Sequence, residues 1–170
     1  IADGETGKIC ANGEIGIIEL RGDNVFQGYW EMPEKTAESF REDGFFITGD
    51  MAVRDADGYV SIVGRDKDLI ITGGLNVYPR EVESLVDEVA GVQESAVIGV
   101  PHPDFGEAVV AIVAAAPGAV SADAVIEALA GKLAKFKQPK SVHLVDTLPR
   151  NSMGKVQKAA LRDEYAGLFA

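Results

Sequence analysis

The sequence predicts an α+β fold, because helical and strand patterns alternate beyond residue 78. Apolar residues recur at helical spacing from Pro79 to Val89, and residues 93–100 and 108–115 read as apolar strands. A capped helix at 121–133, a strand at 142–145 and a helix at 158–165 follow. A helix, two strands, and then a helix, a strand and a helix suit a small domain around one core.

Length and composition limit the classes of function. The chain has 170 residues, 46% of them apolar, so it can bury a core in one domain or slightly more. Its formal net charge of −11 argues against a basic surface for nucleic acid. It has no apolar run of about 18 residues that would span a membrane, and no secretory signal opens it. We therefore expect a cytoplasmic globular protein whose partners include neither nucleic acid nor a membrane.

Cysteine and histidine are too few for a structural metal cage. Cys10 is the only cysteine, and His102 and His143 are the only histidines. A disulfide within the chain is therefore impossible, and no metal site is expected. His102 lies in an expected turn at 101–106 and His143 in an expected strand, and we interpret both as structural.

Residues 1–66 are expected to be the incomplete end of a larger domain, because their strands have turn residues around them but no core of their own. One apolar strand runs into Thr48, Gly49 and Asp50, which places a carboxylate just after a strand end. Such a carboxylate can accept hydrogen bonds from a ribose diol, although an ordinary turn Asp is the alternative. The expected elements are a strand at 16–22, a helix from Pro33 to Arg41, a strand at 45–47, a turn at 55–58 and a strand at 59–63.

The stretch from Gly64 to Glu83 joins this segment to the rest of the chain. It contains charged residues at 65–68, an apolar strand at 69–71, a Gly-Gly pair, and Pro79 at an acidic helix start. A glycine pair lets the backbone run close against another molecule. The stretch therefore predicts a hinge followed by a ligand-facing loop, with a second domain at 67–170.

The last motif is Leu-Pro-Arg-Asn-Ser-Met-Gly-Lys-Val-Gln-Lys at 148–158. A phosphate-binding Gly-x-x-x-x-Gly-Lys-Ser/Thr loop is rejected here. Pro149 stands where the first glycine is required, and Val156 replaces the hydroxyl that would hold magnesium.

The Gly64–Glu83 stretch and the Pro-x-x-x-x-Gly-Lys loop at 149–155 resemble the signatures of the adenylate-forming acyl-CoA synthetases. The resemblance covers essentially the whole chain. It implies the small mobile C-terminal lid domain of such an enzyme at 67–170, preceded by the last β-rich part of its large domain. It also implies an AMP-forming acid–thiol ligase that uses ATP, CoA and a carboxylic acid. Mg²⁺ is implied too, but its acidic ligand and the Ser/Thr/Gly-rich phosphate loop are not found in this chain.

The resemblance assigns roles in the first half-reaction to four residues. Lys155 is the adenylation lysine, whose ammonium lowers the repulsion between the attacking carboxylate and the α-phosphate. Asp50 and Arg65 hold the ribose of the nucleotide, and Lys67 is the pivot between the two domains. A solvated surface lysine is the alternative for both Lys155 and Lys67.

Coenzyme A would use another face of the same domain. By resemblance, the loop that contains Gly73, Gly74 and Asn76 borders the pantetheine channel, where glycines let a narrow arm pass close to the main chain. Phe105 matches an aromatic residue that lines this channel, and a core position is the alternative.

A basic segment at 135–140 is a candidate for the nucleotide end of CoA, with Phe136 for stacking and Lys137 for phosphate contact. Some relatives carry Arg where this chain has Gln138, and a solvated basic loop is the alternative.

Within the family, the residues at 21–36, 71–79 and 149–158 most resemble the malonyl-CoA synthetases, so malonate or methylmalonate is the expected acid. Another short- or medium-chain acyl-CoA synthetase is the alternative, because the acyl pocket lies outside this chain. The 170 residues alone are expected to be inactive. They could instead serve as the substrate of a protein acetyltransferase and its deacetylase, with Lys155 as the acetylated residue.

Overall fold

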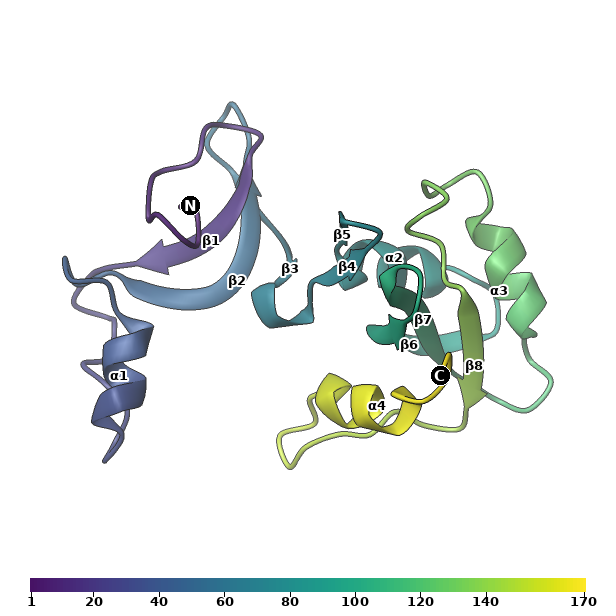
Figure 1. Cartoon of the computed structure of the whole chain (residues 1–170). Coiled ribbons are helices and arrows are strands. Elements are labelled where there is room, and N and C mark those ends of the chain that lie inside the picture. Colours follow the sequence, from purple (N-terminus) through teal and green to yellow (C-terminus); the bar gives the residue numbers. More distant parts are fainter. The chain divides into compact units, whose positions relative to one another are not determined.

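The chain folds into two compact units, residues 1–67 (unit 1) and residues 68–170 (unit 2). A computed structural model describes all of its 170 residues. Figure 1 labels the helices and strands of both units. Each unit is described by itself.

Unit 1 is built on an antiparallel sheet in the order β1, β2, β3. A tight turn joins the last two strands, where the Asp55 carboxylate accepts hydrogen bonds from the backbone N–H groups of Asp57 and Tyr59. The buried apolar residues of this unit are few, namely Ala2, Ile17, Met51 and Ala52. The elements are β1 (Ile15–Leu20), α1 (Pro33–Ser39), β2 (Phe46–Arg54) and β3 (Val60–Arg65).

Strand β2 is longer than the sequence indicates, and this corrects one expectation. Asp50 was expected just after a strand end, but it lies inside β2, paired with Arg65 of β3. The strand continues past Thr48 and Gly49, where the register with β1 is irregular, because β1 pairs on either side of them, at Ile47 and Met51, and β3 pairs from Asp50 onward. The Thr48 hydroxyl also donates to the Ile18 carbonyl at 2.8 Å. The tertiary pairing thus overrides the local turn signal of Thr-Gly-Asp.

Unit 2 is an α+β domain, as predicted. Its sheet has the order β5, β4, β7, β6, and β8 pairs with β7 in parallel. The parallel pair is joined through a helix, as such a crossover requires. The elements are η1 (Asp66–Asp68, which spans the junction of the two units), β4 (Ile70–Thr72), β5 (Leu75–Val77), α2 (Pro79–Val86), β6 (Val92–His102), β7 (Gly106–Ala115), α3 (Ala122–Leu129), β8 (Ser141–Val145) and α4 (Lys158–Tyr165).

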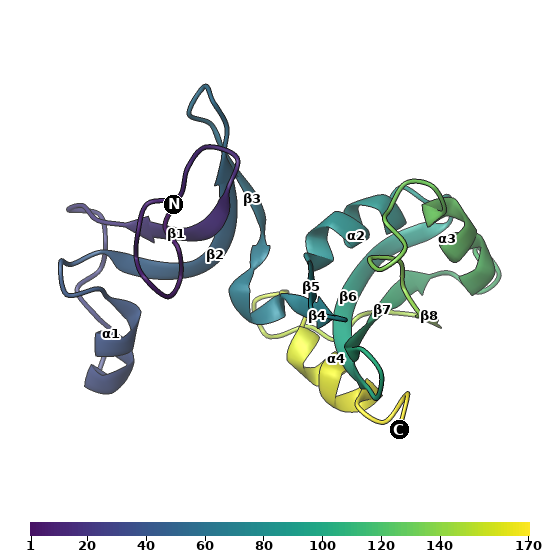
Figure 2. The same ribbon diagram turned by 45° about the horizontal axis from the view of Figure 1, so that its top comes forward.

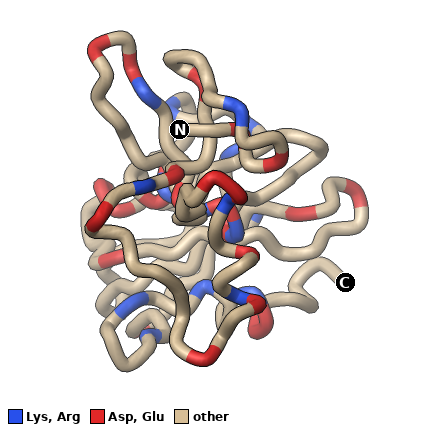
Figure 3. The backbone as a smooth tube through the Cα atoms, turned by 90° about the vertical axis from the view of Figure 1, so that its left-hand side faces the viewer, with Lys and Arg blue, Asp and Glu red and all other residues tan.

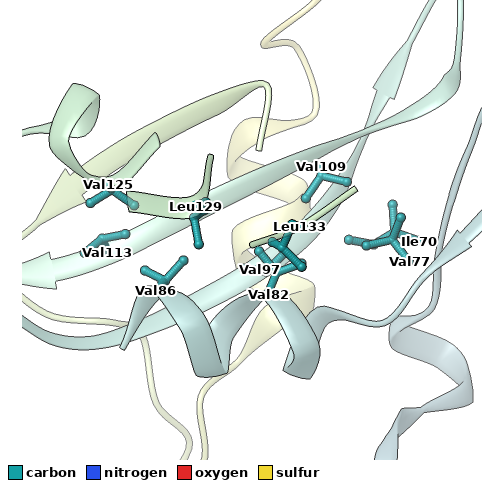
Figure 4. Packing of buried hydrophobic residues seen from close by; sticks show 11 residues of the cluster. Ile70, Val77, Val82, Val86, Val97, Val109, Val113, Val125, Leu129 and Leu133 are labelled. Atoms are coloured by element: carbon teal, nitrogen blue, oxygen red, sulfur yellow. The ribbon is translucent and has the colours of Figure 1, made fainter. Parts of the chain in front are cut away.

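Helices cover both faces of this sheet, which explains why β7 is apolar throughout. Val109, Ala111 and Val113 face one core cluster together with residues of α2 and α3. The residues between them, Val110 and Ile112, face a second cluster that includes Leu161 of α4. Figure 4 shows the first cluster, and Figure 2 shows α2 and α3 on one side of the sheet with α4 on the other. A strand that is buried on both faces reads as a continuous apolar run.

Several element boundaries differ from the expected ones. The Gly-Gly pair closes a hairpin, because β5 pairs with β4 directly after it. Helix α3 ends at Leu129 rather than at residue 133, since Ala130 is extended (φ −61°, ψ 126°). His102 is the last residue of β6 rather than part of the turn, and α2 ends at Val86 rather than at residue 89.

Candidate functional sites

The two predicted nucleotide residues are brought together in unit 1. Asp50 and Arg65 face each other across the β2–β3 ladder, and Arg65 Nε lies 2.7 Å from Asp50 Oδ1. The Asp50 side chain is 27% exposed and that of Arg65 49% exposed. The pair is therefore fixed by a strand register and is still accessible to a ligand.

The predicted pivot lies where the two units join. Lys67 is an exposed residue of the short helix η1. The next residue, Asp68, is held in unit 2, because Arg162 Nη1 of α4 donates to its Oδ1 at 3.1 Å. The first residue of unit 2 is thus tied to α4, whereas Lys67 has no ion pair.

The predicted adenylation lysine is exposed on an ordered loop at 149–157. Asn151 Oδ1 accepts hydrogen bonds from the backbone N–H groups of Met153 at 3.0 Å and Lys155 at 2.9 Å. The N–H of Gln157 donates to the Pro149 carbonyl at 2.8 Å and closes the loop. The loop backbone is therefore fixed while the Lys155 side chain is free of any ion pair.

The loop is joined to the rest of unit 2 on one side of the sheet only. Val156 packs against the second core cluster, the one that contains Leu161 of α4. The Arg150 guanidinium forms an ion pair with Glu94 of β6 and donates to the Gly154 carbonyl at 2.5 Å. These contacts present Lys155 from the α4 side of the sheet.

Three of the predicted CoA residues lie together at a different place. Gly73 and Gly74 form the β4–β5 turn with φ of 58° and 78°, a conformation that favours glycine, and the positions of absent Cβ atoms there are open. The Gly73 N–H donates to the Phe105 carbonyl at 2.8 Å, so this turn is joined to the β6–β7 turn. The Phe105 ring is 39% exposed, and Lys140 Nζ lies 5.2 Å from its centroid. Asn76 is exposed on β5.

The hairpin and the Lys155 loop belong to different sides of unit 2. The buried side chains of the hairpin strands, Ile70 and Val77, join the first cluster with α2 and α3, whereas Val156 joins the second. In Figure 1 the β4–β5 hairpin lies above, and the yellow-green loop before α4 below, on the same side of this unit. One unit thus carries two separate accessible surfaces.

The remaining two predicted CoA residues have other partners. Phe136 packs against the first core cluster, and its ring is only partly exposed. Lys137 Nζ lies 2.7 Å from both carboxylate oxygens of Glu81 in the first turn of α2. The charge of Lys137 is therefore balanced within the chain, whereas Lys140 lies beside Phe105 and has no ion pair.

Two carboxylates with structural contacts were not singled out from the sequence. Glu83 of α2 bridges Lys158 of α4 and the backbone of β6. Glu107 of β7 accepts a hydrogen bond from the N–H of Ile71 in β4 at 2.7 Å. Both contacts join residues far apart in sequence, so local patterns could not predict them. The one sequence signal was the Pro-x-Glu-Val-Glu motif at 79–83, which includes Glu83 but not Glu107.

Charge is dispersed over the molecule. Figure 3 shows acidic positions spread along the tube with basic ones among them. No group of three or more His, Cys, Asp or Glu side chains is arranged to hold a metal ion. None of the helices has the length and apolar character needed to cross a membrane.

The chain is similar to known proteins along almost its whole length. The sequence profile of a family described as AMP-binding enzyme C-terminal domain matches residues 81–155. A methyl-dioxo-octahydroindenyl-propanoyl:CoA ligase of Rhodococcus jostii is 50% identical over 153 residues, which are 89% of this chain and 30% of that protein. A feruloyl-CoA synthase of Amycolatopsis is 45% identical over 163 residues, or 95% of this chain and 33% of that protein. The chain thus spans about a third of the length of these curated relatives.

Solved structures have the same fold. ATP-bound MatB from Rhodopseudomonas palustris is 58% identical with a TM-score of 0.93, and the match covers all of this chain and 34% of that one. An o-succinylbenzoate CoA synthetase from Bacillus subtilis, in complex with an acyl-adenylate intermediate, is 33% identical with a TM-score of 0.88. That match covers 95% of this chain and 33% of the other.

Proposed function

We propose that this chain, which belongs to the AMP-binding enzymes and carries their C-terminal domain, is the C-terminal third of an ATP-dependent acyl-CoA synthetase. The observation that carries the proposal is the pair of separate surfaces on unit 2. One presents Lys155 on a fixed loop, and the other presents the Gly73-Gly74 turn beside Phe105. A lobe with two such surfaces suits an enzyme that catalyses two successive reactions.

Lys155 serves the first half-reaction in this proposal. A carboxylate oxygen of the acid attacks the α-phosphorus of ATP, the bond to the β-phosphate oxygen breaks, and pyrophosphate leaves. Negative charge builds up between two anions, so an ammonium without an internal counterion lowers the barrier. Asp50 and Arg65 hold the ribose from unit 1, and their accessible ion pair supports that role. Mg²⁺ would take part through ligands outside this chain.

The Gly73-Gly74 turn serves the second half-reaction. The thiolate of CoA attacks the acyl carbon of the acyl-adenylate, the carbon–oxygen bond to AMP breaks, and AMP leaves. Open space at both glycines and the exposed Asn76 and Phe105 support a channel for the pantetheine arm. Phe136 and Lys137 would lie toward the nucleotide end of CoA, and Lys137 would have to leave Glu81 to contact a phosphate.

Residues 1–66 are proposed to complete a large domain and residues 67–170 to be the mobile small one, with Lys67 as the pivot. Large apolar side chains of unit 1 are open to solvent, with Trp30 86% exposed and Tyr59 74% exposed. Exposed apolar residues of this size suit a surface that further chain covers. The proposed location of the enzyme is the cytoplasm.

We propose malonate or methylmalonate as the acid. The identity to MatB, 58%, exceeds the 45% to a feruloyl-CoA synthase and the 42% to a long-chain fatty acid CoA ligase. The acid that MatB activates is therefore the first to test. Another short- or medium-chain acid is the alternative, because the named relatives differ in their acids.

The test separates the two half-reactions in the full-length enzyme that contains this chain. Lys155→Ala should abolish acyl-adenylate formation, measured as pyrophosphate release, and spare thioester formation from supplied acyl-adenylate. Gly74→Leu should do the reverse, because its side chain would enter the channel at a φ that suits glycine. Lys132→Ala, an exposed lysine of unit 2, is the control and should affect neither step. Loss of the same step in both test variants would refute the scheme.

Acetylation of Lys155 is a separate proposal, supported by its exposure and its lack of an ion pair. The chain would be incubated with a protein acetyltransferase and acetyl-CoA and then analysed by mass spectrometry. Modification at Lys155 that a deacetylase reverses is the expected result. An unmodified Lys155 beside modified exposed lysines would contradict it.

A further inference from the structure

The β4–β5 hairpin is joined to the rest of the sheet by very few hydrogen bonds. Strand β4 pairs with β7 at one register position only, Thr72 opposite Gly106. Beside this position the Gly73 N–H donates to the Phe105 carbonyl at 2.8 Å. A further bond comes from a side chain, because Glu107 Oε2 accepts from the Ile71 N–H at 2.7 Å. A carboxylate thus takes the place of a backbone acceptor at the edge of β7.

Glu107 lies over a glycine that leaves room for it. A Cβ at Gly99 of β6 would meet Glu107 Oε1 at 2.6 Å and its carboxyl carbon at 2.8 Å. Gly99 is buried and does not have a positive φ, so backbone conformation does not call for glycine at this position. Glycine is required here because any Cβ would overlap the Glu107 carboxylate. Gly99 therefore leaves the space in which the Glu107 carboxylate can accept the Ile71 N–H.

We infer that Glu107 is a positioning residue for thioester formation, which holds the Gly73-Gly74 turn in register with Phe105. This inference rests on the proposed function, in which that turn borders the CoA channel. Glu107 itself has no hydrogen bond to either of the two glycines. It acts through the Ile71 N–H, two residues before Gly73. A charged acceptor makes a strong hydrogen bond to a backbone N–H, so its loss lets the short strand shift.

The inference predicts a defect in one half-reaction only. Displacing a positioned group by about 1 Å can slow a step by roughly 100-fold. The Lys155 loop is attached through the second core cluster and Glu94, on the other side of the sheet. Adenylation should therefore keep its rate when Glu107 is changed.

The experiment measures both half-reactions in the full-length enzyme. Glu107→Ala should slow thioester formation from supplied acyl-adenylate by about 10- to 100-fold and change pyrophosphate release by less than about twofold. Glu107→Gln should restore most of the rate, because its amide oxygen can still accept from Ile71. Glu127→Ala, an exposed glutamate of α3, is the matched control.

Gly99→Ala tests the same contact from the other side. Its methyl group would push the Glu107 carboxylate away from Ile71, so it should give the same selective defect. In the Glu107→Ala background it should add little, because the group it displaces is gone. Gly167→Ala is the control, since a Cβ there meets nothing within 4 Å.

A direct readout comes from amide hydrogen exchange of the 170-residue chain. Exchange at the Ile71 N–H should rise by about tenfold or more in Glu107→Ala but not in Glu107→Gln, while β7 amides stay unchanged. If the wild type forms the thioester and both Glu107→Ala and Gly99→Ala form it at the same rate, this inference is overturned and the proposed function is not. Equal loss of both half-reactions would also overturn it, because the role would then be structural. A wild-type enzyme that forms acyl-adenylate but no CoA thioester would overturn the proposed function, and this inference with it.

Discussion

Replacement of Glu83 should destabilise unit 2 through two lost contacts. Glu83 Oε1 lies 2.6 Å from Lys158 Nζ and also accepts the Val97 N–H of β6 at 2.8 Å. The side chains of Lys158 and Glu83 are only 19% and 16% exposed, and Val97 is fully buried. The Glu83 carboxylate thus binds a backbone N–H of β6 and also joins α2 to α4 through its ion pair.

The expected loss of stability follows from these contacts. Breaking a fully buried ion pair by removing one partner costs about 3–5 kcal/mol, and partial exposure here should reduce that to about 2 kcal/mol. Leaving the Val97 N–H without a partner adds about 1 kcal/mol. We therefore expect Glu83→Ala to lower the free energy of unfolding by about 3 kcal/mol. Lys158→Ala should cost about half as much, because Glu83 keeps its bond to Val97 and is partly hydrated.

The assay must follow unit 2 rather than unit 1. The single tryptophan, Trp30, lies in unit 1, so its fluorescence reports on that unit. Amide exchange of the buried β7 residues against denaturant reports on unit 2. Lys132→Ala is the control, because the pair of Lys132 with Glu88 is 3.8 Å long and exposed, and its loss should cost less than about 0.5 kcal/mol.

The Glu83→Gln variant separates the ion pair from the hydrogen bond. Its amide oxygen can still accept from Val97, so it should resemble Lys158→Ala rather than Glu83→Ala. The reasoning would be refuted if Glu83→Ala destabilised the β7 amides no more than Lys132→Ala does.

Three further changes test the local structure of unit 2. Ser121→Ala should cost about 1 kcal/mol, because the Ser121 hydroxyl caps α3 by accepting the Ala124 N–H; urea unfolding checks this, with the exposed Ser152→Ala expected to be neutral. Leu129→Ala should cost about 2–5 kcal/mol, because its side chain is fully buried between α3 and the sheet; a loss no larger than that of Leu144→Ala, whose side chain is 44% exposed, would contradict it. Burial, and then the charge of Glu164, raises the pKa of Tyr165 above 10.0. The stability tied to its neutral phenol is therefore present below the unfolded-state pKa and is lost as pH rises through the folded-state pKa. Tyr165→Phe should accordingly lessen the fall in unfolding free energy between about pH 8 and about pH 11, and an unchanged fall would count against this.

The sequence determined the local features of unit 2 well. Helix α4 occupies the expected residues 158–165, and Ser121 caps α3 as expected. Both follow from signals within a few residues of each other, namely apolar spacing and a hydroxyl before a helix. The adenylate-forming family could likewise be recognised from the sequence, because each of its motifs is a contiguous stretch of residues. The roles of Lys155, Asp50 and Arg65 stay predictions.

Contacts between residues far apart in the chain came from the packing of the elements and not from local sequence patterns. Pairing with β3 keeps Asp50 inside a strand, although Thr-Gly-Asp looks like a turn. Lys137 forms an ion pair with Glu81, and Glu107 accepts a hydrogen bond from the backbone of β4. These partners are separated by 15 to 56 residues. Local spacing sets the period of an element, whereas its ends and the partners of its polar side chains depend on which elements the packed core brings together.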